Sequence, residues 1–188
     1  MSGTTQSSRP VALQVLTPDE CARVLGERLE LRRSEVVTSD KWWRRSVQAW
    51  LFRPQWSWLY EVLESRIPRD GIDPTLRLNE LQLVHYQPAG WYLNHRDNDS
   101  AAIAHRRHTI SIPLKNAWLG GGLTLLCEGH AIRASDEIGT ATIFPASLIH
   151  RANPVIAGLR ISLVGWLSHP AELPRELAIL QGQHADTL

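Results

Sequence analysis

The sequence predicts a mainly β domain with helices before the β region. After Gly71, short segments alternate apolar and polar residues, as strands with one buried face do, and Gly, Pro and Asn separate these segments. Helix signals come earlier in the chain and again near its end. Several strands at this spacing indicate a sandwich, barrel or jelly roll. The expected strands cover residues 75–86, 108–114, 123–129, 139–144 and 158–167.

The composition suits one compact domain, because 43% of the 188 residues are hydrophobic and can fill a core. A net charge of +1 gives no field that would attract nucleic acid or an anionic membrane. No apolar run approaches the roughly 20 residues of a membrane helix, and the polar N-terminus shows no secretory signal. We expect a soluble cytoplasmic protein that binds neither nucleic acid nor membrane; the sequence does not indicate its oligomeric state. Cys21 and Cys127 match no metal or redox spacing, so we expect both to be reduced and buried.

Two helices are expected before the β region. The first begins at the sequence TPDE, where Thr17 can cap the helix, Pro18 suits the first helical position and Glu20 can complete a capping box. It should end near Leu31. The second helix should cover residues 55–67, because the Pro and Gly that follow stop it.

The expected organisation is one domain over residues 1–188, since no repeat, low-complexity segment or linker divides the chain. Its parts should be a disordered stretch (1–10), a helical N-terminal support (11–70), the β core (75–168) and a C-terminal helix (170–183).

A Trp-rich segment, residues 41–58, contains five of the eight tryptophans of the chain. Such residues ordinarily pack in a core, because Trp is a large hydrophobic group with a single donor. An aromatic wall beside a substrate is the alternative. The sequence leaves both interpretations open.

The first candidate site is a His-x-Asp pair that follows a predicted strand. Residues two apart in a strand face the same side, so His95 and Asp97 could present an imidazole and a carboxylate to one ion. These are two of the three ligands of the 2-His-1-carboxylate arrangement, which leaves open positions on Fe(II). A second such pair, His184 and Asp186, lies in the polar C-terminal tail with no histidine after it, and we interpret it as coincidental.

A histidine and an arginine further along the chain could complete this site. His150 follows an apolar strand, and Arg160 comes ten residues later inside an otherwise apolar strand. An unpaired buried guanidinium is costly, and Arg suits a carboxylate that accepts two parallel hydrogen bonds. An internal salt bridge or an exposed strand edge would also satisfy Arg160. Together these residues indicate an anionic ligand near a metal. The residues that share a strand face with Arg160 are Ser162, Val164 and Trp166.

Three segments of the chain carry a family resemblance: HYQPAGWYLNHRD, RRHTISIPLKNAWLGGGLTLL and GTATIFPASLIHRANPVIAGLRISLVGWL. In this order and with these gaps, they resemble the iron- and 2-oxoglutarate-dependent oxygenase superfamily, in particular its prolyl-4-hydroxylase-like branch. The resemblance covers roughly residues 78–168. It implies a double-stranded β-helix, or jelly roll, as the core of the fold.

The resemblance also implies the site residues and the reaction. The iron ligands and catalytic residues would be His95, Asp97 and His150. Arg160 would hold the distal carboxylate of 2-oxoglutarate, with Ser162 assisting, and Tyr86 would line the cosubstrate pocket unless its hydroxyl is bonded elsewhere. With Fe(II), 2-oxoglutarate and O2, the enzyme would hydroxylate an unactivated C–H bond of a small-molecule, amino-acid-like or peptidyl substrate and release succinate and CO2.

One departure concerns the position where many relatives have a tyrosine that contacts the cosubstrate. Here it is Pro113, which cannot donate a hydrogen bond, so Thr109 and Ser111 on the same strand face are the candidates to replace it.

Three further expectations concern residues that flank the predicted site. We expect Trp91 and Arg96 near the pocket mouth, His85 next to the pocket, and the sequence HRRH (105–108) exposed.

Three other function classes remain open. A cupin-like isomerase or a metal-binding sensor can also hold a metal with His and carboxylate ligands in a jelly roll. A nucleic-acid demethylase-like oxygenase is a further alternative, although the near-neutral charge argues against it. A catalytically silent relative acting as a binding domain would not need the intact set of metal ligands.

Overall fold

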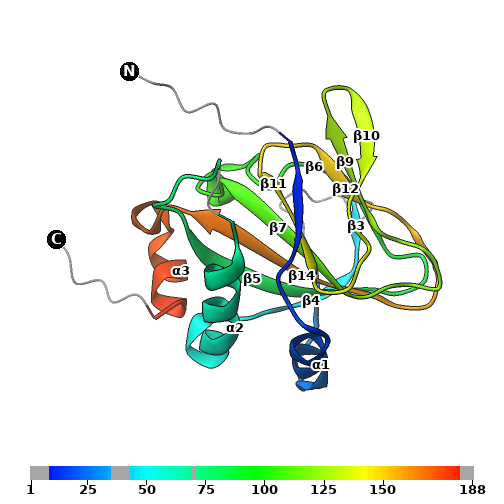
Figure 1. Cartoon of the computed structure of the whole chain (residues 1–188), viewed down its shortest axis with the longest axis horizontal. Coiled ribbons are helices and arrows are strands. Elements are labelled where there is room, and N and C mark those ends of the chain that lie inside the picture. The colour runs from blue at the N-terminus through cyan, green and yellow to red at the C-terminus, as the bar shows by residue number, and fades with distance from the viewer. Residues whose placement is uncertain (1–8, 35–42, 69–70, 183–188) are drawn as a thin grey trace.

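The computed structural model describes residues 9–34, 43–68 and 71–182, and it consists of two main antiparallel sheets with helices on one side (Figure 1). The larger one, called the major sheet, has seven strands. In spatial order they are β1 (Val11–Gln14), β11 (Thr140–Pro145), β7 (His108–Lys115), β14 (Arg160–Ser168), β5 (Arg77–Tyr86), β4 (Val47–Trp50) and β2 (Arg32–Arg33).

A smaller five-stranded sheet, called the minor sheet, closes the other side of the core. Its strands in spatial order are β10 (His130–Arg133), β9 (Leu123–Cys127), β12 (His150–Ala152), β6 (Trp91–His95) and β3 (Arg44–Arg45). A separate pair joins β13 (Val155–Ala157) to β8 (Leu119–Gly120). The two facing antiparallel sheets form a jelly-roll core, so the predicted fold class is confirmed.

The helices are α1 (Pro18–Gly26), α2 (Arg53–Arg66) and α3 (Arg175–Leu180), with short 3-10 turns η1 (Ala101–Ile103) and η2 (Pro170–Glu172). The start of α1 agrees with the sequence signals, whereas α2 begins two residues before the expected residue 55 and α3 begins five residues after the expected residue 170. Both halves of the capping box form at α1, since Glu20 N donates to Thr17 Oγ1 at 3.2 Å and Thr17 N donates to Glu20 Oε2 at 2.8 Å. However, α1 ends at Gly26, one turn before the expected Leu31.

The expectation of a purely helical support over residues 11–70 is wrong. β1 extends one edge of the major sheet by pairing with β11, and β4 pairs with β5 inside the same sheet. These four-residue strands show too little alternation to be recognised alone, and their partners lie far away in the sequence.

The C-terminal helix is also shorter than the expected 170–183. η2 and then α3 occupy that segment, and α3 ends at Leu180. The disorder expected for residues 1–10 falls mainly outside the described residues, as does the His-x-Asp pair at 184–186.

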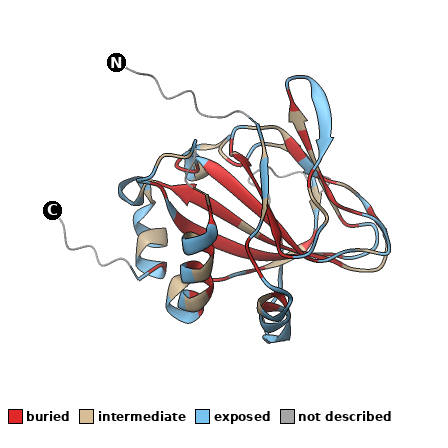
Figure 2. Ribbon diagram, viewed as in Figure 1, coloured by how far each residue is buried: buried red, intermediate tan, exposed pale blue. Residues whose placement is uncertain are grey.

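Strand alternation gives the major sheet two different faces. One face is apolar and packs against α1 and α2, with α1 on β7 and α2 on β5. The central strands of this sheet are mostly buried, whereas the helices are partly exposed (Figure 2). On β14 this face carries Ile161, Leu163 and Leu167, as parity predicts, and Leu159 just before the strand packs against the same cluster. The opposite, inner face carries Arg160, Ser162, Val164 and Trp166, and these side chains line a cavity between the two sheets. The sheet therefore buries its apolar residues on one side and leaves its polar residues for a site on the other.

Close packing also constrains the turn before β9. Gly121 has a φ of 73°, a left-handed conformation that favours glycine, and a Cβ at this position would lie 3.2 Å from Cδ of Arg160. The glycines of this turn therefore let the chain pass close to the arginine.

Two further findings concern the cysteines and the possibility of a membrane-spanning helix. Cys21 and Cys127 are buried, and neither forms a disulfide bond within the described residues, as expected. Among the described residues, no helix has the length and apolar character needed to cross a membrane.

We predict that Leu63→Ala destabilises the protein. Leu63 lies on α2 with 0% exposure in the core cluster, and replacing a buried Leu by Ala ordinarily costs about 2–5 kcal/mol. Equilibrium urea unfolding measures this loss, and Leu180→Ala at a half-exposed position on α3 is the control. Equal, small losses in both variants would show that α2 does not contribute to the core.

Candidate active site

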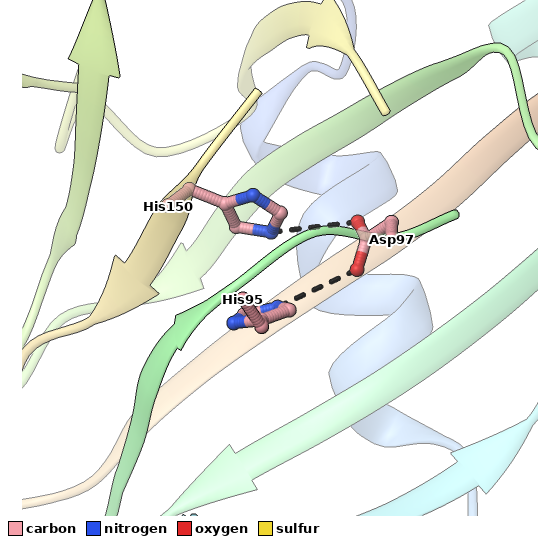
Figure 3. Close-up of side chains that lie close together, drawn as sticks. All are labelled: His95, Asp97 and His150. Carbon is pink, nitrogen blue, oxygen red and sulfur yellow. Dashed lines mark ion pairs between the residues drawn. The ribbon is translucent and has the colours of Figure 1, made fainter. Parts of the chain in front are cut away.

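Two histidines and an aspartate converge at one end of the cavity between the sheets (Figure 3). His95 ends β6 and His150 begins β12, and these antiparallel neighbours place the two residues directly opposite each other. Asp97 follows two residues after His95. Nε2 of His95 lies 3.4 Å from Oδ1 of Asp97, and Nε2 of His150 lies 3.4 Å from Oδ2. The ligand atoms all lie within 4.8 Å of one another, so one ion could contact all three side chains.

The backbone orients both imidazoles. Nδ1 of His95 donates to the carbonyl of Leu93 at 2.7 Å, and Nδ1 of His150 donates to the carbonyl of Leu148 at 2.9 Å. These bonds place a proton on each Nδ1 and direct each Nε2 toward the carboxylate, as in histidines that bind metals. The Tyr92 ring also stacks on His95, with centroids 3.4 Å apart.

The Asp97 carboxylate is buried and held by two further donors. The Thr109 hydroxyl donates to Oδ2 at 2.7 Å, and Nε1 of Trp166 donates to the same oxygen at 2.9 Å. Burial by itself raises the pKa of Asp97, but the charge and hydrogen bonds of His150 and His95 outweigh it and hold that pKa well below its ordinary value. The carboxylate is therefore charged and fixed in orientation, which suits a cation ligand.

The pKa values of the two imidazoles shift in opposite directions. Burial lowers the pKa of His95. For His150, burial is outweighed by the Asp97 carboxylate, which raises its pKa. Two imidazole nitrogens and a carboxylate facing one point form the donor set that non-haem Fe(II) sites use, so these residues fit a divalent iron.

The other end of the cavity offers a site for an anion. Arg160 is only 5% exposed, and its guanidinium lies over the Tyr86 ring at 5.2 Å from the centroid. Among the described residues, neither Nε of Arg160 nor the Ser162 hydroxyl has a hydrogen-bond partner, although both are buried. Buried polar groups are nearly always bonded, and an unpaired buried charge is costly. The internal salt bridge considered as an alternative for Arg160 does not form within the described part of the chain, so a bound carboxylate fits there.

One cavity of about 290 Å³ contains both ends of this site. The six residues identified from the sequence all line it: Tyr86, His95, Asp97, His150, Arg160 and Ser162. Three of them come from the minor sheet or the loop after it, and three come from β5 and β14. The two sheets thus supply the cation-binding and anion-binding ends separately.

Thr109 has a different contact from the expected one. It was a candidate to replace the tyrosine missing at Pro113, but its hydroxyl donates to Asp97 instead. Ser111, the other candidate, lines the cavity. The second Asp97 donor, Trp166, was not recognised from the sequence, although its parity with Arg160 was a usable signal.

Three residues of the sequence HRRH (105–108) are buried where the segment was expected to be exposed, and only Arg107 is exposed. Arg106 is 7% exposed and donates through Nε to Oε2 of Glu80 at 3.0 Å, and His105 lies 2.9 Å from the same oxygen. The Arg106 guanidinium also lies 3.8 Å from the centroid of the Trp166 ring. Burial is possible because the carboxylate of Glu80 compensates the charge.

Two other expectations about the pocket surroundings are wrong. His85 and Trp91 line a separate cavity on the other face of β5. The inward-facing neighbours of His85 are Val84 and Tyr86, so His85 itself points away from the metal ligands. Arg96 does line the main cavity and is exposed, as expected for its mouth.

The Trp-rich segment contains tryptophans that pack in the core and a tryptophan that lines the cavity, which were the two interpretations left open by the sequence. Trp56 is buried in the core, and Trp58 packs against it. Trp50 on β4 instead lines the main cavity, 37% exposed. Residues 41–42 of this segment lie outside the described residues.

Residues 81–168 match the family whose description is the 2OG-Fe(II) oxygenase superfamily. This part of the chain is similar to the members of this superfamily. The match contains every site residue named above and excludes the N-terminal strands and helices. Oxygenases of this superfamily use Fe(II), 2-oxoglutarate and O2, so the family resemblance seen in the sequence is confirmed.

Curated relatives of this chain include two PKHD-type hydroxylases. A PKHD-type hydroxylase of Synechococcus elongatus is 29% identical over 99 residues, which cover 48% of this chain and 44% of the relative. A PKHD-type hydroxylase of Rippkaea orientalis is 28% identical over 110 residues, which cover 55% of this chain and 49% of the relative. The chain thus matches about half the length of these relatives.

Solved structures share the fold of this chain at low identity. A prolyl-4-hydroxylase of Pseudomonas putida has a TM-score of 0.66 at 21% identity, covering 86% of this chain and 94% of that one. A prolyl hydroxylase of Trichoplax adhaerens, in complex with a hypoxia inducible factor peptide fragment, has a TM-score of 0.69 at 15% identity, covering 88% and 86%. HygX of Streptomyces hygroscopicus, with nickel and 2-oxoglutarate bound, has a TM-score of 0.62 at 12% identity, covering 85% and 82%. These similarities show that the fold is shared.

We predict that Thr109→Val weakens metal binding and that Thr109→Ser retains it. Valine keeps the shape of threonine but removes the hydroxyl that orients Asp97, whereas serine keeps the hydroxyl. Groups that orient metal ligands ordinarily contribute about 10–100-fold to affinity. Calorimetric titration with Mn(II) measures the effect. Equal affinity of the valine variant and the original protein would show that the hydroxyl does not position the carboxylate.

Proposed function

We propose that this chain is an Fe(II)- and 2-oxoglutarate-dependent dioxygenase that hydroxylates an unactivated C–H bond of its substrate and releases succinate and CO2. One observation carries the proposal. A cavity presents a His-Asp-His group at one end and, at the other, a buried arginine with no ion-pair partner in the described residues. The first end suits iron and the second suits a carboxylate.

Each site residue has a role in this proposal. The iron ligands are His95, Asp97 and His150. Arg160 binds the distal carboxylate of 2-oxoglutarate, Ser162 donates a further hydrogen bond to it, and the Tyr86 ring covers the guanidinium. When bound, iron and 2-oxoglutarate supply the oxidising chemistry, and the protein residues orient them and exclude water.

The substrate is proposed at the level of a class. Two relatives of known fold are named as prolyl hydroxylases, one of them in complex with a peptide fragment. A cavity of about 290 Å³ suits a small-molecule or amino-acid-like substrate, or the reacting residue of a peptide. We also propose that residues 1–188 form a single oxygenase domain, since both sheets line the cavity that contains the site and the helices α1 and α2 pack on the other face of the major sheet.

The alternatives explain fewer of these features. A cupin-like isomerase or a sensor would use the metal ligands but would leave Arg160 and Ser162 without partners. A demethylase-like oxygenase acting on nucleic acid would need a basic surface, whereas the net charge here is +1.

We predict that His95→Ala loses metal binding and that His184→Ala does not. Both histidines stand in a His-x-Asp sequence, but His95 has His150 opposite it, whereas no histidine follows His184 in the sequence. Mn(II) titration of the two variants compares them directly. Loss of affinity in both, or in neither, would contradict the assignment of the ligands.

We predict that Arg160→Ala weakens 2-oxoglutarate binding at least about tenfold, equivalent to about 1.4 kcal/mol, and leaves metal affinity unchanged. The guanidinium faces the cavity but lies outside the metal ligand set. The matched control is Arg151→Ala, an exposed arginine one residue after His150. Calorimetric titration of each protein with Mn(II) gives the metal affinity. A second titration of the Mn(II)-loaded protein with 2-oxoglutarate gives the 2-oxoglutarate affinity. An equal loss of metal and 2-oxoglutarate affinity would argue against the role of Arg160.

A further inference from the structure

The inner face of the major sheet has a polar and aromatic surface that borders the cavity. We call this surface the glutamine wall; it includes neither a metal ligand nor Arg160. It consists of Gln48, Trp50, Gln82 and Trp166, and all four side chains line the cavity. Gln82 on β5 pairs with Trp50 of β4 on one side and with Val164 of β14 on the other. The rings of Trp50 and Trp166 are 6.1 Å apart between centroids and inclined at 45°.

One of the two glutamines has an unused hydrogen-bonding group. Oε1 of Gln48 is buried without a partner among the described residues. Gln82 is 5% exposed and lines the same cavity. An unsatisfied buried polar group costs about 1–3 kcal/mol. The unpartnered Oε1 of Gln48 on the cavity surface therefore indicates a ligand that donates to it, and the Gln82 side chain on the neighbouring strand can bond to the same ligand.

The glutamine wall carries no uncompensated charge. Its nearest cation, Arg106, lies over Trp166 and is bound by Glu80. The remaining arginines of the cavity mouth, Arg44 and Arg96, belong to the minor sheet and the loop after it. A charged substrate group at the wall would lose its hydration without gaining a counterion, so the wall favours an uncharged polar group.

A carboxamide is the natural complement of a glutamine side chain. Each carboxamide has an acceptor oxygen and a donor nitrogen, so two amides can form a matched pair of hydrogen bonds. A carboxylate or an ester lacks the donor, and so does an amide whose nitrogen carries no hydrogen. The adjacent tryptophan rings offer an apolar surface for the part of the ligand next to the amide.

We propose that Gln48 and Gln82 bind an N–H-bearing amide group of the substrate, with the neighbouring apolar part of the substrate against Trp50 and Trp166. This proposal rests on the proposed function, because the glutamine wall borders the same cavity as the metal ligands. Gln48 and Trp50 lie outside residues 81–168, the part of the chain that matches the superfamily. The amide preference is therefore a property that the N-terminal segment adds to the shared oxygenase site.

The test uses the full chain loaded with Mn(II) and 2-oxoglutarate and four probes with the same ring. The probes are cyclohexanecarboxamide, its N,N-dimethyl derivative, methyl cyclohexanecarboxylate and sodium cyclohexanecarboxylate. The paramagnetic relaxation of the probe protons by Mn(II) reports binding close to the metal. We expect the primary amide to bind at least about tenfold more tightly than the other three probes. The reason is that it alone has an N–H that can donate to the unpartnered Oε1 of Gln48.

Variants locate this preference. In Gln48→Leu and Gln82→Leu, the ratio of the affinity for the primary amide to the affinity for the other probes should fall to near one. Gln55→Leu, at an exposed position on α2, should keep the ratio of the original protein. Binding of 2-oxoglutarate should be unchanged in all three variants.

Three results would overturn the proposal: equal or tighter binding of a probe without an N–H, no binding of the primary amide, or a preference that survives in both leucine variants. The 2-oxoglutarate affinity measured in the same samples separates the two levels of the account. If 2-oxoglutarate binds and the amide does not, the amide proposal alone is wrong. If 2-oxoglutarate itself does not bind, the proposed function is wrong.

Discussion

The site depends on one buried carboxylate that has to stay charged. Asp97 is 6% exposed, and four side chains from different strands direct donors or imidazole nitrogens at it: His95, Thr109, His150 and Trp166. A buried charge is tolerated only when it is paired and bonded. The contacts of Asp97 therefore join β6, β7, β12 and β14, and the two sheets hold each other in register where the metal would bind.

The alternation of side chains along the strands decides where the other site residues lie relative to this carboxylate. The major sheet uses its apolar face to pack against α1 and α2, so its polar residues lie on the inner face. Along β14 the inner residues run from Arg160, through Ser162 and Val164, to Trp166. One strand thus carries the proposed cosubstrate anchor at its start and the support of the metal ligand near its end. The pairing of β5 and β4 extends the same inner face to the glutamine wall.

The residues that could be predicted are those with a local signal. The spacing of His95 and Asp97, the isolated Arg160 in an apolar strand, and the capping box of α1 are all visible within a few residues. The contacts that were missed join distant segments. Arg106 was expected to be exposed because nothing near it in the sequence compensates its charge, whereas Glu80 does so from another strand. The strand β4 was missed for a related reason, since four residues carry little alternation and its pairing with β5 decides its conformation.

The central claim is that the cavity holds iron and 2-oxoglutarate together and oxidises a substrate with them. Its most direct test is the visible absorption of the purified protein, loaded anaerobically with Fe(II), before and after 2-oxoglutarate is added. Chelation of iron by the keto acid should produce a weak charge-transfer band, and admitting air with a substrate should yield succinate. A protein that binds Fe(II) but shows no band and forms no succinate would contradict the account.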